Sequence, residues 1–289
     1  MDIRSLLLAA ACLPFLVLGA LPATAQDDVR RTVRIRLLDA EDVTRAELRA
    51  VDGTLRLTTG AEGSTLAQLD PGETASLGTR SGEVYLRLGR GGLYAESIHV
   101  QAPEGARWAI TPPDGRTRTY SGALTVRPDL AASRGLQLVN EVPLEEYVAG
   151  VVASEYTLDD VEGRKAMAVV ARTYALYARA ASDEPYDHVD HVGSQVYRGP
   201  STITAEARAA ARATRGEVLT YDGRLIQAVY SASSGGHTAN HEDVWAADRV
   251  LPYLRGKHDP YDVNSPHARW QLRGLPAPGF VRPRRLAAF

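Results

Sequence analysis

The feature that most constrains the fold is a change in hydrophobic period near the middle of the chain. From residue 32 to residue 128, apolar residues repeatedly alternate with other residues, as in Val33, Ile35 and Leu37. Period two predicts half-buried strands, because successive side chains of a strand point to opposite faces. Turn sequences such as Asp70-Pro71-Gly72 separate the alternating segments. The first half of the chain is therefore predicted to be rich in β-structure.

The spacing of apolar residues becomes helical after residue 140. Pro143 is expected at the first helical position, with Glu145 and Glu146 in the first turn, near the positive end of the helix dipole. Further helices are predicted at 159–181, where alanine is abundant, and at 204–214. The apolar residues that give the first of these helices its buried stripe are Leu144, Tyr147, Val148, Val151 and Val152.

A β-hairpin is predicted beyond the third helix. The segments 217–221 and 224–230 flank Asp222-Gly223, which is a two-residue signal of a tight turn. The predicted fold class is therefore α+β, with a β-rich N-terminal half followed by a mixed helix and strand core. We place the boundary between the two parts near residues 130–134.

The amino terminus has the pattern of a secretory signal peptide. An apolar run spans residues 6–21, with Arg4 in front of it and Ala23-Thr24-Ala25 behind it. We expect residues 1–25 to be removed and the protein to be exported to the periplasm or the cell wall. An uncleaved membrane anchor is the alternative.

The single cysteine, Cys12, lies inside this apolar run. A lipidated cysteine is disfavoured, because the run continues past it, whereas a polar mature chain should follow a lipidation site. Removal of the signal leaves no cysteine, and hence no disulfide and no thiol nucleophile. The net charge is −2 and the basic tail at 282–285 is short, so nucleic-acid binding is not expected.

Glu155 is the first candidate for chemistry. It lies eleven residues after Leu144, about three helical turns, so it ends the apolar stripe if the helix continues that far. A carboxyl group beside apolar residues suits a general acid near neutral pH, because burial disfavours its charged form. The alternative is a helix-end glutamate that faces water.

A serine- and glycine-rich segment at 231–238 is the second candidate. Its small residues let a polar, sugar-like ligand approach the backbone closely. With His237 and Asp243 nearby, a serine hydrolase could be considered, but the pattern G-x-S-x-G is missing. The alternative is an ordinary serine-rich loop.

Two histidines, His188 and His191, are spaced so that both imidazoles could meet one metal ion, and they lie in a predicted loop with Asp187 and Asp190. A closed zinc site needs further ligands, and no cysteine is available to complete it. We therefore expect neither a metal nor another cofactor, and a solvated polar loop is the simpler interpretation.

Short motifs follow one another between residues 120 and 270. They are Tyr120-Ser121-Gly122, Leu138-Val139-Asn140, L-E-E-Y-x-x-G-V-V-x-x-E at 144–155, A-R-T-Y at 171–174, Gln195-Val196-Tyr197, Ser233-Ser234-Gly235-Gly236 with Thr238, the segment 240–245, Pro252-Tyr253-Leu254, and Trp270. In order and spacing this series resembles the SpoIID/LytB family, the stage II sporulation protein D and amidase-enhancer proteins of bacterial cell walls. In that family the L-V-N motif is expected to form a turn.

The resemblance implies a peptidoglycan lytic transglycosylase. One glutamate protonates the glycosidic oxygen between N-acetylmuramic acid and N-acetylglucosamine, and the primary hydroxyl of the muramic acid then closes an anhydro ring. This reaction needs no second carboxylate to activate water, unlike ordinary glycoside hydrolysis. Glu155 matches the catalytic glutamate. The positions that match as substrate-groove or supporting residues are Arg172, Tyr174, Gln195, Tyr197, Ser233, Ser234, Gly236 and Thr238.

Two departures from the family pattern affect the predicted core at 131–289. Some members have a cysteine-histidine zinc site before Q-V-Y, where this chain has Ser194. The family also continues through further strands after the tryptophan that Trp270 matches, so either the last strands are absent or the sequence is truncated. The rival to an enzyme is a binding protein that holds glycan strands and stimulates or recruits a cell-wall amidase; the intact Glu155 favours the enzyme.

Overall fold

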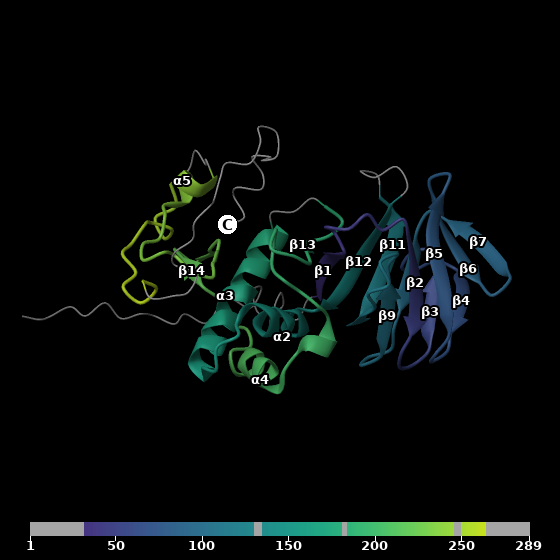
Figure 1. Cartoon of the computed structure of the whole chain (residues 1–289), viewed down its shortest axis with the longest axis horizontal. Coiled ribbons are helices and arrows are strands. Elements are labelled where there is room, and N and C mark those ends of the chain that lie inside the picture. The colour runs from purple at the N-terminus through teal and green to yellow at the C-terminus, as the bar shows by residue number, and fades with distance from the viewer. Residues whose placement is uncertain (1–31, 130–134, 181–183, 246–249, 264–289) are drawn as a thin grey trace, which may run out of the picture.

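The computed structural model describes residues 32–129, 135–180, 184–245 and 250–263. Two β-sheets form one end of the molecule and the helices follow beside them (Figure 1). The predicted α+β class, with a β-rich N-terminal part followed by a mixed part, is confirmed. The expected signal peptide, Cys12, the basic tail and Trp270 lie outside the described residues.

The larger sheet has seven strands in the order β13-β1-β12-β11-β8-β3-β4. All neighbouring strands in it are antiparallel except β1 and β13, which run parallel. The bounds of its strands are β1 Thr32–Leu37, β3 Leu55–Thr58, β4 Thr65–Leu69, β8 Ile98–Gln101, β11 Ala123–Pro128, β12 Leu136–Pro143 and β13 His188–Val189.

The second sheet has six strands in the order β10-β9-β2-β5-β6-β7, and its strands are antiparallel. Their bounds are β2 Arg45–Ala50, β5 Thr74–Arg80, β6 Glu83–Leu88, β7 Gly91–Ala95, β9 Arg107–Thr111 and β10 Arg118–Ser121. The predicted period of two is confirmed in β2, where buried and exposed side chains alternate along the whole strand.

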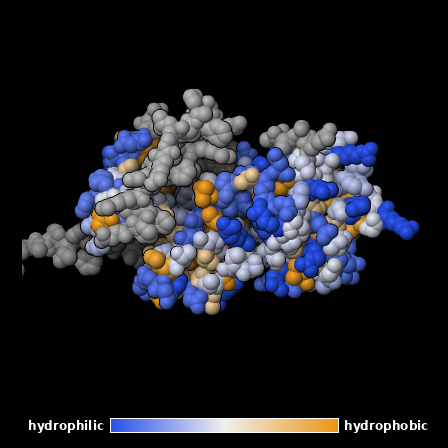
Figure 2. Space-filling view, in the orientation of Figure 1, coloured by the Kyte–Doolittle hydropathy of each residue, from blue (hydrophilic) through white to orange (hydrophobic). Residues whose placement is uncertain are grey.

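One hydrophobic core joins the two sheets. It includes Val100 and Val126 of the larger sheet and Leu48 and Leu86 of the smaller one, each 0% exposed. Full burial of one such side chain stabilises the fold by about 1.5–3 kcal/mol. Over the strands, the face of the molecule in Figure 2 is mainly hydrophilic and its hydrophobic residues form small separate groups.

The strand β12 begins just after residues 130–134, the predicted boundary between the two parts. It pairs with β11 on one side and with β1 on the other, so one sheet contains strands from both sides of residues 130–134. The division into two regions stays a prediction about folding units. Residues 138–140 lie within β12, so the expected L-V-N turn is wrong. Asn140 tolerates this central, fully buried position because its Nδ2 donates to the carbonyl oxygens of Ser121 and Ala123, at 2.8 and 2.9 Å.

The bounds of the helices are α2 Leu144–Glu155, α3 Val161–Ala180, α4 Ala205–Ala213 and α5 His241–Trp245, with a short 3₁₀ helix, η1, at Pro200–Thr202. Helix α2 contacts β1 and β12 of the larger sheet, helix α3 contacts β13, and helix α4 packs against both of these helices. The three predicted helices are confirmed within one or two residues at each end. Pro143, however, is the last residue of β12 and the N-cap of α2 rather than its first helical residue.

Helix α2 is buried on nearly every side. It contacts β1, β12, α3, α4 and η1, and its buried residues are Leu144 and the six consecutive residues from Tyr147 to Val152. A helix that is apolar all round belongs in a core. Glu155, at its C-terminal end, is therefore supported by a helix whose middle is buried on all sides.

The predicted tight turn is confirmed at Asp222-Gly223, where φ is 49° and 73°. The strands that flank it, β14 Thr220–Tyr221 and β15 Arg224–Leu225, are much shorter than the predicted segments 217–221 and 224–230. They form a sheet of two strands only, and an isolated sheet of two strands is marginally stable, in agreement with their short length.

Within the described ranges, no helix combines the length and the apolar character that crossing a membrane requires.

Candidate active site

Glu155 is the last residue of α2, and a backbone group holds its carboxylate. The helix ends here because Tyr156 has extended backbone angles, φ −120° and ψ 101°. The half-buried Glu155 side chain accepts a hydrogen bond from the N–H of Val196, at 2.8 Å to Oε1. An oxygen fixed in this way keeps the carboxylate at one place beside the segment 195–197, in agreement with the expected end of the apolar stripe.

A chain of hydrogen bonds runs beside this carboxylate. The hydroxyl of Tyr147 donates to Oε1 of Gln195 at 3.1 Å, and Nε2 of Gln195 donates to the hydroxyl oxygen of Tyr230 at 3.3 Å. Tyr147 and Gln195 are fully buried. Both ends of the Gln195 amide are therefore used inside the protein.

Tyr230 connects this chain to Glu155. The residue is 36% exposed, but its hydroxyl accepts a hydrogen bond from the fully buried Gln195. Desolvation raises the pKa of the Tyr230 phenol, and the negative charge of Glu155 with a hydrogen bond between the two groups raises it further. Since Gln195 donates to the phenol oxygen, the protonated phenol can donate its own hydrogen to the Glu155 carboxylate.

Tyr197 packs directly against α2. It is 1% exposed, and its ring lies 5.4 Å from the ring of Tyr147 and 6.4 Å from that of Tyr120. A Cβ atom added at Gly150 would stand 2.7 Å from Cε2 of Tyr197, so only glycine leaves room for this ring on the helix. The side chain of Tyr197 therefore supports the site from within the core.

Arg172 is a buried connector between helices. Its guanidinium binds Glu145 of α2 and donates to backbone carbonyls, including those of Ala211 and Glu217 at 3.1 Å each. Because it is 0% exposed and its N–H groups face protein acceptors, any part that it plays in substrate binding is indirect.

The two histidines have separate partners. His188 is 1% exposed and lies in β13, not in a loop; its ring stacks on Tyr147 and its Nε2 lies 3.2 Å from the carbonyl oxygen of Ala175. Burial lowers the pKa of His188 to about 4. Nε2 of His191 lies 3.1 Å from Oδ2 of Asp39. The part of the chain that the structure describes holds no cluster of three or more His, Cys, Asp and Glu side chains placed for a metal.

Tyr174, another predicted site residue, lies on α3 near the same buried histidine. Its half-buried ring is 5.9 Å from the ring of His188. Burial raises the pKa of the Tyr174 phenol, and a hydrogen bond with Ser194 partly offsets this effect. Tyr174 therefore lies against the segment that leads to Gln195.

The serine- and glycine-rich segment forms a second group. The hydroxyl of Ser233 and the N–H groups of Ser234 and Gly235 converge on Oδ2 of Asp262, at 2.6, 2.6 and 2.7 Å. These hydrogen bonds lower the pKa of Asp262 to about 2, the bond from the Ser233 hydroxyl most of all. Gly236 has a positive φ of 94°, which glycine adopts readily.

Thr238 connects the same segment to residues 257–258, which pair with it as in an antiparallel bridge. Its N–H donates to the carbonyl oxygen of Lys257, and its Oγ1 accepts from the N–H of Lys257, each at 2.8 Å. Among the described residues, no hydrogen bond links 233–238 to Glu155. The structure thus links Glu155, Gln195 and Tyr197 through one set of contacts, and Ser233, Ser234, Gly236 and Thr238 have other partners.

Sequence reasoning missed several polar partners. The sequence places Tyr147 only on an apolar stripe and gives no role to Tyr230, the backbone of Val196 or Asp262. A tyrosine at a fully buried helical position does carry a signal, because its hydroxyl needs a partner inside the core. Nothing in the local sequence marks Asp262, which lies 28 residues after Ser234.

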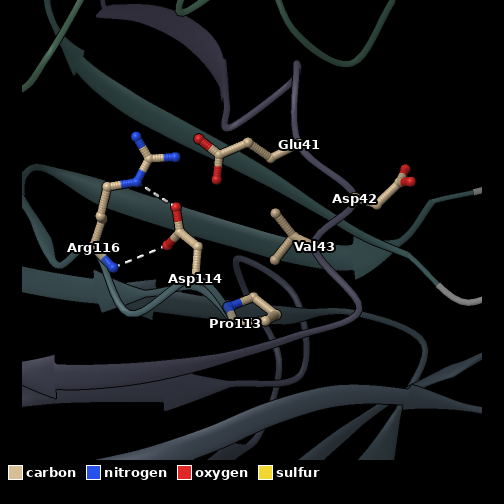
Figure 3. Close-up of a pocket in the computed structure, with 6 residues that line it drawn as sticks. All are labelled: Glu41, Asp42, Val43, Pro113, Asp114 and Arg116. Atoms are coloured by element: carbon tan, nitrogen blue, oxygen red, sulfur yellow. Dashed lines mark hydrogen bonds and ion pairs between the residues drawn. The ribbon is translucent and has the colours of Figure 1, made fainter.

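A separate hollow of about 250 Å³ lies in the β-rich part (Figure 3). Figure 3 shows two hydrogen bonds from Arg116 to the Asp114 carboxylate. The backbone N–H of Arg116 donates at 2.9 Å and its Nε donates at 2.5 Å. None of the predicted site residues lines it. Its lining consists of Glu41, Asp42, Val43, Pro113, Asp114 and Arg116.

Comparison with known proteins gives a consistent family. The model of the family described as SpoIID, Stage II sporulation protein, matches residues 132–221. An uncharacterized protein of Brachyspira hyodysenteriae is 39% identical over 122 residues, which cover 41% of this chain and 33% of that protein. Stage II sporulation protein D of Bacillus amyloliquefaciens is 34% identical over 145 residues, covering 44% of this chain and 42% of the relative.

A third relative carries the other name of the family. The amidase enhancer of Bacillus subtilis is 36% identical over 124 residues, covering 43% of this chain and 16% of that protein. The chain therefore spans well under half the length of the curated relatives that it matches. The matched region contains α2 with Glu155, α3 and the segment 195–197, and over this region the chain is similar to the SpoIID/LytB family.

Proposed function

We propose that this protein is an exported lytic transglycosylase that cleaves peptidoglycan glycan strands, with Glu155 as its acid and base. The observation that carries the proposal is the place of Glu155: a carboxylate at the end of a buried helix, held by the N–H of Val196 and bordered by the Tyr230 hydroxyl. Similarity to a family that includes a sporulation protein and an amidase enhancer supports a role at the cell wall.

The proposed reaction needs one proton-carrying group. The Glu155 carboxyl group donates its proton to the glycosidic oxygen, and the bond from that oxygen to C1 of the muramic acid breaks. The primary hydroxyl oxygen on C6 of the same sugar bonds to C1, and its proton passes to the Glu155 carboxylate. The catalyst is regenerated and no water is consumed. Such positioned acid and base catalysis contributes about 10² to 10⁴-fold in rate.

The neighbours of Glu155 suit these two proton transfers. A fixed N–H on Oε1 restricts the orientation of the carboxyl group, and a positioned acid loses less rate to misalignment. A protonated phenol at Tyr230 stabilises the carboxylate that remains after the first transfer. Ser233, Ser234, Gly236 and Thr238 are proposed to contact glycan from the separate loop, and Tyr174 to line the approach beside Ser194.

Cleavage of stem-peptide-free glycan strands tests the function. Purified protein is incubated with these strands, and the products are examined by mass spectrometry for anhydro-muramic ends. Products with ordinary reducing ends would instead indicate hydrolysis. Unchanged strands would contradict the proposal that the protein is an enzyme.

The second candidate function is a glycan-binding protein that stimulates or recruits a cell-wall amidase. The name of the Bacillus subtilis relative, amidase enhancer, favours it. In that case the protein binds the strands in a pull-down without cutting them, and it raises the rate of an added amidase. Export itself is tested by the amino terminus of the secreted protein, which we expect at Gln26.

A further inference from the structure

The segment 195–197 is attached to α2 at three successive residues. The side chain of Gln195 accepts from Tyr147, the N–H of Val196 donates to Glu155, and the ring of Tyr197 packs over Gly150. Two of these attachments, at Gln195 and Tyr197, are made by side chains that are 0% and 1% exposed. The half-buried C-terminal end of α2 and the segment beside it are thus fixed from the core.

We infer that Tyr147 and Gln195 are positioning residues for Glu155. Their buried hydrogen bond fixes the backbone N–H of Val196, and the second bond of Gln195 fixes the Tyr230 phenol beside the carboxylate. The inference rests on the proposed function for its effect on catalysis. It replaces the expectation that Gln195 contacts substrate, because Gln195 is 0% exposed and both ends of its amide bond to protein groups, Tyr147 and Tyr230.

The direction of the Gln195 amide is the central step. The Tyr147 hydroxyl is a donor to Oε1, so the opposite end, Nε2, must face Tyr230. The Tyr230 oxygen then accepts, which leaves the phenol hydrogen for Glu155. Burial raises the pKa of the Tyr147 phenol well above its usual value, so this first donor keeps its proton throughout the neutral range.

The same bond also restrains the backbone. Val196 follows Gln195 directly, and its N–H reaches Glu155 only while the Gln195 side chain remains seated in the core beside Tyr147. Without the Tyr147 hydroxyl, the Gln195 carbonyl is a buried acceptor with no donor, and the segment must move to find one. A shift of a fraction of an ångström is enough to misalign a catalytic carboxyl group.

Kinetics on stem-peptide-free glycan strands distinguish positioning from substrate contact. We expect Tyr147→Phe and Gln195→Leu each to lower kcat by about 10- to 100-fold with KM unchanged, since neither group touches the substrate. The double variant should be no worse than the single ones, because both remove the same restraint. Tyr120→Phe, which removes the hydroxyl of another fully buried tyrosine, is the matched control and should leave kcat unchanged. A raised KM with normal kcat in Gln195→Leu would overturn the inference.

A second measurement does not depend on cleavage. Hydrogen exchange of the Val196 amide, followed by NMR, should be about tenfold faster in Tyr147→Phe and Gln195→Leu and unchanged in Tyr120→Phe. Unaltered protection of Val196 in the first two variants would contradict the inference whatever the enzyme does. Faster exchange in a protein whose wild type cuts no glycan would instead support the restraint and reject the transglycosylase.

Discussion

Arg172 of α3 holds Glu145 of α2 through two parallel hydrogen bonds, from Nε to Oε1 at 2.9 Å and from Nη2 to Oε2 at 2.7 Å. The guanidinium is fully buried, and its remaining N–H groups reach carbonyl oxygens at Ala211 and Glu217 near the end of α4. One side chain thereby connects three parts of the helical layer that carries Glu155. A planar fork of five donors is suited to such a task, and lysine cannot replace it.

Arg172→Met is expected to destabilise the fold strongly. It leaves the Glu145 carboxylate and several buried carbonyls without a donor, which costs about 3–5 kcal/mol. The free energy of unfolding in urea measures the loss. Lys165→Met on the same helix is the control, because its ion pair with Glu162 is largely exposed and is worth about 0–1 kcal/mol. Equal losses in the two variants would contradict the role assigned to Arg172.

Gly150→Ala is expected to lower stability although alanine is the better helix former. Helix propensity alone favours alanine by about 1 kcal/mol. The new Cβ would, however, stand 2.7 Å from Tyr197, and relief of such overpacking costs about 1–3 kcal/mol. Thermal unfolding measures the net effect. In a Tyr197→Leu background the same substitution should cost less, whereas an equal cost in both backgrounds would mean that the ring is not the obstacle.

Glu155→Gln is expected to abolish cleavage while it preserves the fold and glycan binding. Glutamine keeps the oxygen that accepts from Val196 but has no transferable proton, so the rate should fall by about 10² to 10⁴-fold. Release of anhydro-ended products and a pull-down with the same strands are measured together. Glu162→Gln, on the exposed start of α3, is the control. Wild-type turnover by Glu155→Gln would remove Glu155 from the mechanism.

Asp262 is expected to make the loop at 233–236 sensitive to acid. The folded state lowers its pKa from the ordinary value of 3.8 to about 2, first of all through the hydrogen bond from Ser233. Its contribution to stability is therefore complete above pH 3.8 and is lost as the pH falls through about 2. Unfolding of wild type and Asp262→Asn is compared across this range. The difference between them should be constant at neutral pH and shrink in acid; a difference that grows in acid would give the opposite sign to the linkage.

Local patterns in the sequence predicted those parts of the structure that depend on neighbouring residues. The alternation in β2 follows from the two-residue period of a strand, and the turn at Asp222-Gly223 follows from the backbone freedom of its two residues. The same reasoning predicted α2 and the place of Glu155 at its end, because the apolar stripe repeats at the helical period. The motif order predicted the family.

Only the tertiary structure decided which polar groups meet. Tyr147 and Gln195 are 48 residues apart, and Asp262 binds Ser234 across 28 residues. It also decided that residues 138–140 form a central strand and that Arg172 turns inward to Glu145. The physical reason is that periodicity reports which face of an element is buried, whereas the partner of a buried donor or acceptor is set by how distant segments pack around it.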